Sequence, residues 1–181
     1  PTRMRPNGVG RGRFAAYMMR GGPGPLMVAT LSLDAEAMAL LLARGAEVDL
    51  PNVFRITPLM AAAGMSGNGR ANFPQGGDVQ ARVLKAIDVL LDAGADIHAR
   101  VTDSRTRTAK LTAYIQGRDH EGKTAVFAAA ESGWDRVVKH LVARGADATT
   151  RDASGKTPLD YARSPAPVGQ GGVAQSPAAA A

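Results

Sequence analysis

The segment GRDHEGKT, Gly117 to Thr124, matches the phosphate-binding pattern G-x-x-x-x-G-K-[ST] at every defined position. In such a loop the backbone amides surround the phosphates, while the lysine contacts phosphate and the final hydroxyl contacts a magnesium ion. The preceding KLTAYIQ is a candidate strand, and the following TAVFAAAES is a candidate start of a helix. The residue types and their order therefore raise the question of whether the chain binds a nucleotide.

The lysine and threonine of this segment occur a second time in the chain. Another GKT begins at Gly155, 33 residues after the one at Gly122, and it lacks the upstream glycine. Asp119 and Glu121 would place negative charge where a phosphate has to bind. No hydrophobic strand ending in a magnesium-binding Asp follows. We therefore interpret GKT as part of a repeated turn, and we expect no nucleotide, no other cofactor and no enzymatic activity.

The remaining candidates for metal or acid–base chemistry are scattered. His98, His120 and His140 do not have the spacing of metal ligands on one helix, and the chain has no cysteine. Asp88 and Asp92 are one helical turn apart, which we interpret as a solvated helix face. The sequence therefore predicts neither a metal site nor a catalytic group.

Composition favours helices and leaves the partner open. Hydrophobic residues make up 45% of the chain but aromatic residues only 4%, which is typical of closely packed small helices. The net charge of +6 would permit contact with nucleic acid, an anionic membrane or an acidic protein. The apolar runs are shorter than the roughly 20 residues of a membrane span, so we expect none. Because the chain opens with Pro1, we interpret it as processed; its location is either cytoplasmic or, after removal of an export signal, bacterial periplasmic or secreted.

A repeat of 33 residues organises the chain. PLMVAT begins at Pro25 and PLMAAA at Pro58, in register with the two GKT segments. Helix-like segments end in the related tails LLLARGAEVD, LLDAGADIHA and LVARGADATT, whose glycines are Gly45, Gly94 and Gly145. Such a period is typical of an array of small units, each of which buries its apolar face against its neighbours.

The third copy shows the expected unit most completely. Thr124 is placed to cap a first helix, AVFAAAES, with its side chain, and Gly133 is placed to end that helix. WDRVVKHLVARG forms a second helix that Gly145 ends in a left-handed conformation. The next segment, ADATTRDASGK, makes an extended turn back to a Thr-Pro pair.

These segments resemble the ankyrin repeat. TPLMAAA, GWDRVVKHLVARGAD and DASGKTPL are similar to its motifs T-P-L-H-x-A-A, G-H-x-x-V-V-x-x-L-L and G-A-D. The resemblance covers roughly Gly22 to Arg163, and it looks closest to bacterial ankyrin proteins with inserted loops. It implies an all-α ankyrin-repeat solenoid of about four helix–turn–helix units with hairpin-like turns, the last unit truncated.

Three regions follow from this interpretation. Residues 1–20 are a basic N-terminal segment whose FAAYMM is a candidate remnant of an upstream repeat, and 21–163 are the repeat domain. The domain carries a first insertion near 64–79 and a second, basic insertion near 100–118. Residues 164–181 are rich in Pro, Ala and Gly and are expected to be a disordered tail. Arg55 stands at a turn position that is glycine in the other copies, so we expect an altered backbone there.

The resemblance also implies contact positions for a partner. In ankyrin proteins they flank the turn glycine and follow the Ala-Ala of the first helix, which here selects Val53, Phe54, Ile56, His120, Glu121, Lys123, Glu131, Ser132, Ala153, Ser154 and Lys156. Three of them, Val53, Phe54 and Ile56, are apolar at a turn expected to be exposed, so either the first insertion or a partner covers them. The second insertion adds Arg105, Arg107 and Tyr114. Trp134 is either a packing residue or a groove contact.

The expected function is recognition of another protein without catalysis. A stack of such units offers a concave groove and a row of turn tips to a partner, as a scaffold does. We expect a monomer. The alternative is binding of nucleic acid or an acidic surface through the arginine-rich N-terminus and the second insertion, although these segments lack aromatic stacking platforms for bases.

Overall fold

The computed structural model describes residues 23–66, 69–70, 73, 76–102 and 120–163. Over these ranges the chain is mostly helical, which confirms the all-α prediction. The segments 1–20 and 164–181, together with Arg105, Arg107 and Tyr114, lie outside the described residues. The elements are α2 (Pro25–Leu31), α3 (Ala35–Ala43), α4 (Pro58–Ala62), β1 (Met65–Ser66), β2 (Gly69–Arg70), α5 (Val79–Asp92), α7 (Ala125–Glu131), α8 (Asp135–Ala143) and α9 (Pro158–Arg163).

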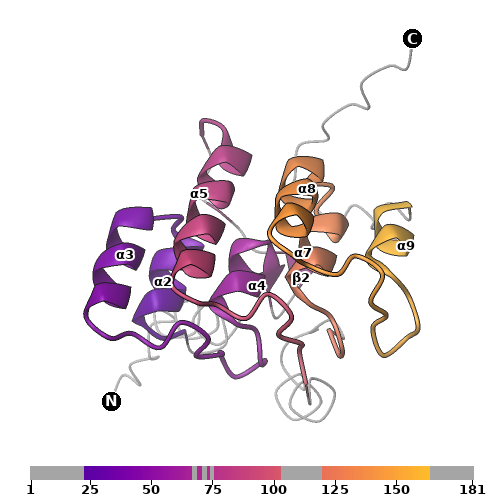
Figure 1. Ribbon diagram of the computed structural model, residues 1–181, viewed down its shortest axis with the longest axis horizontal. Coiled ribbons are helices and arrows are strands. Elements are labelled where there is room, and N and C mark those ends of the chain that lie inside the picture. The colour runs from indigo at the N-terminus through magenta and orange to yellow at the C-terminus, as the bar shows by residue number, and fades with distance from the viewer. Residues whose placement is uncertain (1–22, 67–68, 71–72, 74–75, 103–119, 164–181) are drawn as a thin grey trace, which may run out of the picture.

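The described helices form two rows (Figure 1). An inner row runs α2, α4, α7, α9, and each of its helices contacts the next. An outer row runs α3, α5, α8 in the same way, and the two rows contact each other in the pairs α2–α3, α4–α5 and α7–α8. None of the helices in the described ranges is long and apolar enough to cross a membrane.

Most helix starts follow from local chemistry. Asp34 and Asp78 accept hydrogen bonds from backbone amides three residues ahead, and Thr57 does the same for Met60. Thr124 also stands at the N-cap of its helix, but its side chain makes no capping hydrogen bond, so that prediction was wrong. Instead the backbone carbonyl of Thr124 accepts from the Phe127 amide at 3.2 Å.

The predicted glycine caps are confirmed. Gly45, Gly94 and Gly145 follow the three outer helices with φ angles of 85°, 89° and 103°, a region that side chains disfavour. Leu33 adopts a φ of 53° at the position that Gly133 occupies two units later. Local preference does not predict this conformation, because it is costly for leucine unless burial compensates, and Leu33 is 6% exposed.

Arg55 corrects a second expectation. Its φ is 62°, close to the 77° of Gly122 and the 78° of Gly155, so the turn keeps the same backbone instead of an altered one. The carboxamide oxygen of Asn52 holds this turn by accepting from the amides of Phe54 and Ile56, at 2.9 Å and 3.1 Å. Arg55 therefore keeps a left-handed backbone conformation that is strained for any residue other than glycine.

Replacing Arg55 with glycine should raise the free energy of unfolding by about 0.5 to 1 kcal/mol, because the left-handed conformation costs a side-chain-bearing residue more than glycine loses in chain entropy. Urea denaturation followed by helical circular dichroism would measure it. The matched control is Gly122→Ala, where an added Cβ would lie 2.9 Å from the backbone nitrogen of Ala153 and should destabilise the fold. A destabilised Arg55→Gly variant would contradict the strain argument.

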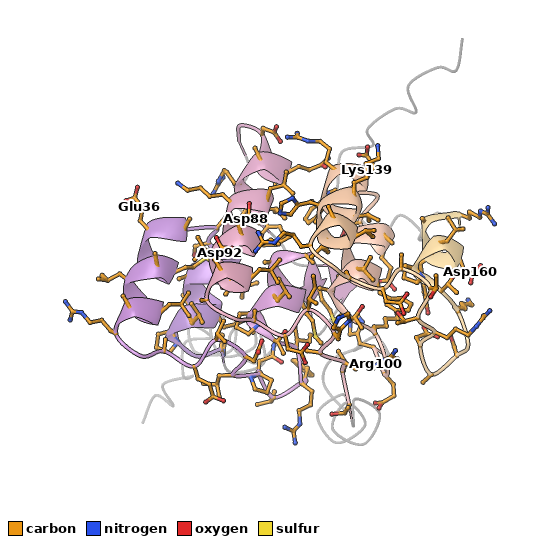
Figure 2. The ribbon with its side chains drawn as sticks, viewed as in Figure 1. Glu36, Asp88, Asp92, Arg100, Lys139 and Asp160 are labelled. Carbon is orange, nitrogen blue, oxygen red and sulfur yellow. The ribbon has the colours of Figure 1, made fainter. Side chains whose placement is uncertain are left out.

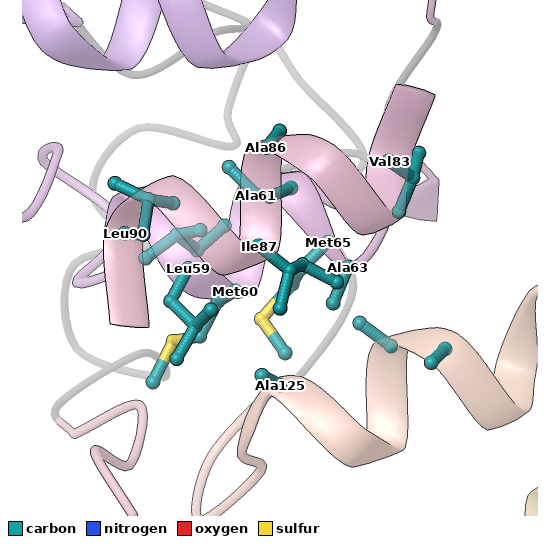
Figure 3. Close-up of a cluster of buried hydrophobic side chains, with 14 of the residues drawn as sticks. Leu59, Met60, Ala61, Ala63, Met65, Val83, Ala86, Ile87, Leu90 and Ala125 are labelled. Atoms are coloured by element: carbon teal, nitrogen blue, oxygen red, sulfur yellow. The ribbon is translucent and has the colours of Figure 1, made fainter. Parts of the chain in front are cut away.

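The centre of the core lies between α4 and α5 (Figure 3). All five residues of α4 are buried, and its alanines allow α2, α5 and α7 to approach closely. Ile87 and Leu90 of α5 close the other side with no exposed surface. A single unit could not bury α4 on all of these sides, so the neighbouring units complete its burial.

Ion pairs join the outer helices α5 and α8. Asp88 accepts from Arg144 at 2.6 Å and lies 2.8 Å from the Nε2 of His140, and Arg144 also reaches Asp92 at 2.6 Å. Figure 2 shows both carboxylates on α5. The side chains of Asp88 and Asp92 are 40% and 70% exposed, so they lie on a solvated face, where cations of the next outer unit also reach them.

Candidate functional site

The segment that matches the phosphate-binding pattern is used for internal pairing. The Gly122 amide donates to the Val101 carbonyl at 2.8 Å, and the Val101 amide donates to the Lys123 carbonyl at 2.9 Å. The Lys123 amide donates to His120 at 3.0 Å. These amides therefore close a turn in the described structure rather than surrounding an empty cradle; residues 117–119 lie outside the described residues.

Lys123 is buried, which corrects its prediction as an exposed contact residue. Its side chain is 6% exposed, and its Nζ lies 2.5 Å from the Oε1 of Glu131 and 4.2 Å from the ring centroid of Tyr161. An ammonium can be buried when a carboxylate and an aromatic face replace its hydration. Lys123 thus ties the turn before α7 to the end of α7 and to α9, and Glu131 takes part in the same interaction.

His120 is buried as well, so its prediction as a turn-tip contact was wrong. Its Nε2 lies 2.8 Å from the carbonyl oxygen of Ser66 in the first insertion, and because a carbonyl only accepts, Nε2 is the donor. Strand β1 is thereby held against the segment before α7. Glu121 is half-buried, and its backbone carbonyl accepts from the Ala153 amide at 3.1 Å.

Trp134 is half-buried and packs against the first insertion. Its ring lies 5.7 Å from that of Phe73, at an interplanar angle of 33°. Gly64 makes room beside it, since an added Cβ would lie 2.8 Å from the Oγ of half-buried Ser132 and 3.2 Å from the indole. Sequence reasoning missed Phe73; the available signal was a single aromatic residue within a glycine-rich insertion.

The second turn is only partly exposed. Phe54 and Ile56 are 3% and 0% exposed and belong to the core, so the expected exposure of this turn was wrong for these two, and the fold itself rather than a partner covers them. Asn52 folds the turn so that side chains 54 and 56 point inward, whereas Val53 is 37% exposed and Arg55 is also exposed. Leu50, which the sequence did not single out, is 49% exposed in the same turn. We name Leu50, Val53 and Arg55 the tip patch.

The fourth turn presents the predicted residues Ala153, Ser154 and Lys156, all exposed. Asp152 organises it by accepting from the Ser154 amide at 2.9 Å, the Lys156 amide at 3.0 Å and the Tyr161 hydroxyl at 2.5 Å. Asp152 stands six residues before Pro158, as Asn52 does before Pro58, and both side chains accept amides two and four residues ahead.

These hydrogen bonds determine the charge states at the turn. Burial would raise the pKa of Asp152, but the hydrogen bonds from Tyr161, Ser154 and Lys156 outweigh it and hold the pKa below its usual value. Burial, together with donation to Asp152, raises the pKa of Tyr161 to about 12. The pair is therefore a carboxylate with a protonated phenol across the neutral pH range.

Successive turns are cross-linked along one edge. The Asp96 amide donates to the Asp49 carboxylate at 2.9 Å. Arg100, at the start of the second insertion, donates through Nη1 to the carbonyls of Gly122 and Arg151, at 3.3 Å and 3.1 Å. Figure 2 shows Arg100 among the turns, away from the outer helices. The turn tips are thus held at fixed positions relative to one another.

Neither the scan against protein-family models nor the search of curated proteins finds a match. Within the described ranges, no group of three or more histidine, aspartate or glutamate side chains is placed to hold a metal ion.

Proposed function

We propose that the protein is a non-catalytic protein-binding module, an ankyrin-type stack of about four units that engages a partner through its turn tips. The two rows of helices, the left-handed residues at equivalent turn positions and the 33-residue register support this assignment. The cross-linked turns support the binding role, because contact residues on a rigid edge lose little freedom when a partner docks.

The tip patch is the observation that carries the proposal. Leu50 and Val53 are 49% and 37% exposed in one turn, which Asn52 holds by two hydrogen bonds and Phe54 and Ile56 anchor in the core. Apolar side chains fixed at an exposed edge are typical anchors of a protein interface, and a neighbouring arginine is a frequent companion. The tip patch therefore has the composition of an interface centre.

Charge along the same edge indicates the partner's chemistry. Arg55, Arg100 and Lys156 are exposed at successive turns, and the chain as a whole carries a net charge of +6. A partner that combines an apolar cluster with flanking acidic residues would satisfy both the tip patch and these cations. We therefore propose an acidic protein surface as the target.

The test is the double variant Leu50→Ser, Val53→Ser. The partner would first be captured from the source cell on the immobilised protein and identified by mass spectrometry, and its dissociation constant then measured by calorimetry. The double variant should weaken binding by about tenfold or more, since both anchors are lost, with an unchanged helical signal.

The matched control is Leu40→Ser, which removes a 59% exposed leucine on outer helix α3, away from the turns. It should leave the dissociation constant unchanged. If the double variant binds as tightly as the unaltered protein, the tip patch is not the interface.

A further inference from the structure

The outer row ends one helix earlier than the inner row. In the described residues α8 is the last outer helix, whereas α9 continues the inner row beyond α7 (Figure 1). Each earlier outer helix contacts both its own inner helix and the outer helix that follows it. The position beside α8 and over α9 is where a fourth outer helix would stand.

Equivalent positions on the outer helices show what that helix would cover. The residue seven positions before the glycine cap is Met38 in α3, Ile87 in α5 and Val138 in α8. Met38 and Ile87 have no exposed surface, while Val138 is only half-buried. The third residue back is Leu42, Leu91 or Val142. Leu42 and Leu91 are half-buried, but Val142 is 44% exposed. The side of α8 that faces onward is therefore more exposed than its counterparts.

The inner row shows the same difference. The second residue of each inner helix is Leu26, Leu59, Val126 or Leu159, and their exposed fractions are 5%, 1%, 1% and 54%. The first three belong to units that have an outer helix, and Leu159 belongs to the unit without one among the described residues. We name Val138, Val142 and Leu159 the end face.

We propose that the end face binds one amphipathic helix of a partner protein, in the position of a fourth outer helix. The interface would continue the one by which α5 stacks on α3 and α8 stacks on α5, so its occupant is a helix with an apolar stripe along one side. The end face lies on α8 and α9 and is separate from the tip patch of the proposed function.

A lysine of α8 stands where α5 has an aspartate, and this difference predicts which charged residues the partner's helix carries. Lys139 stands six residues before its glycine cap, where α5 has Asp88, and Asp88 binds His140 and Arg144 of the helix that follows it. Lys139 is 81% exposed, and Figure 2 shows it on α8 at this end of the molecule. The incoming helix should therefore carry acidic residues where α8 carries His140 and Arg144.

Neither residues 164–181 nor a second copy suits the end face as closely as a separate amphipathic helix does. The sequence after Arg163 has Pro165 and Pro167 and no helical spacing of apolar residues. A second copy would present α2 and α3 together, so its α2 would meet α9 and its α3 would be held one layer away from α8. If α3 of the second copy instead took the place beside α8, its Arg44 would face Lys139 at the equivalent register, an unfavourable pair of like charges.

The experiment uses two fluorescein-labelled peptides and the full chain. The basic peptide has the sequence WDRVVKHLVARG of residues 134–145, and the acidic peptide carries Arg136→Glu, His140→Glu and Arg144→Glu. In fluorescence anisotropy titrations the acidic peptide should bind saturably and more tightly than the basic one. Val142→Glu or Leu159→Glu in the protein should weaken this binding by about tenfold or more, because each places a charge in the apolar contact.

The variant Lys139→Asp should reverse the preference in favour of the basic peptide, by roughly two- to fivefold, the range of an exposed ion pair. Leu40→Glu at the opposite end, and the double variant of the tip patch, should bind the acidic peptide like the unaltered protein. These controls separate a failure of the end face from a failure of the proposed function.

Three results would overturn the proposal. One is the absence of saturable binding, and another is equal binding to the protein with Val142→Glu and to the unaltered chain. The third is a concentration-dependent dimer in sedimentation that Val142→Glu abolishes, since a second copy would then be the occupant. All variants alter exposed positions, and circular dichroism would verify their folding.

Discussion

Replacing Lys123 with methionine should lower the free energy of unfolding by about 3 to 5 kcal/mol, the range for breaking a buried ion pair. The side chains of Lys123 and Glu131 are 6% and 11% exposed, so the carboxylate would lose its cation where water can hardly replace it. The variant would also remove the cation from the Tyr161 ring, 4.2 Å from the ammonium. Urea denaturation monitored by circular dichroism would measure the change.

The loss of stability depends on whether one partner of the ion pair is removed or both. The double variant Lys123→Met, Glu131→Met should recover a large part of the loss, because two apolar side chains leave no buried charge behind. Lys139→Met is the surface control: its partner Asp135 lies 3.6 Å away and both side chains are mostly exposed, so the change should stay within about 0.5 kcal/mol. A cost below about 1 kcal/mol for Lys123→Met would show that burial contributes little to this pair.

Replacing Asp152 with alanine should destabilise the protein by about 3 kcal/mol, because several donors lose a buried acceptor at once. The donors are the Tyr161 hydroxyl, the Ser154 hydroxyl and amide, and the Lys156 amide. The matched control is Asp147→Ala, which removes an exposed carboxylate that accepts from Thr149 and should destabilise the protein much less, because water can replace the lost acceptor. Equal losses in the free energy of unfolding for the two variants would contradict the argument that burial makes the Asp152 hydrogen bonds more stabilising.

The pH dependence gives an independent check on Asp152. Its pKa in the folded protein lies below the ordinary value of 3.8, so its contribution is complete above that pH and is lost as the pH falls through the folded pKa. Tyr161, whose folded pKa is about 12 against an ordinary 10.0, contributes fully below pH 10.0 and loses its contribution as the pH rises through about 12. The stability difference between the unaltered protein and Asp152→Asn should therefore be constant near neutral pH and shrink below pH 3.8. A difference that persists undiminished below the folded pKa would refute this assignment.

Local chemistry made the helices predictable. The glycine caps at Gly45, Gly94 and Gly145, and the helices on either side of Gly133, follow from backbone preferences that act over a few residues. The expected cap by Thr124 failed although the residue stands at the right position, since its side chain makes no capping hydrogen bond. The position of the N-cap residue was predictable from the sequence, whereas the hydrogen-bond partner of its side chain was not.

The contact residues were less predictable, because exposure at a turn depends on what packs beneath it. His120, Lys123, Phe54 and Ile56 are polar or apolar residues at turns, and all four are buried. His120 is covered through the Ser66 carbonyl, and Lys123 through Glu131 and Tyr161, contacts that span 54, 8 and 38 residues of sequence. The spacing of residues within a repeat cannot predict such contacts, since it describes only neighbours along the chain.

The sequence by itself determined the all-α architecture, the 33-residue register and the glycine-ended outer helices, because propensity, periodicity and caps are properties of a few consecutive residues. The second GKT also indicated that Lys123 belongs to a repeated turn. Only the tertiary structure decided which turn residues face outward, placing Leu50, Val53 and Arg55 at the surface while burying Phe54 and Ile56. It alone set the left-handed conformations of Leu33, which packs in the core, and of Arg55, in the turn that Asn52 holds by hydrogen bonds, because these contacts outweigh the preference of each residue.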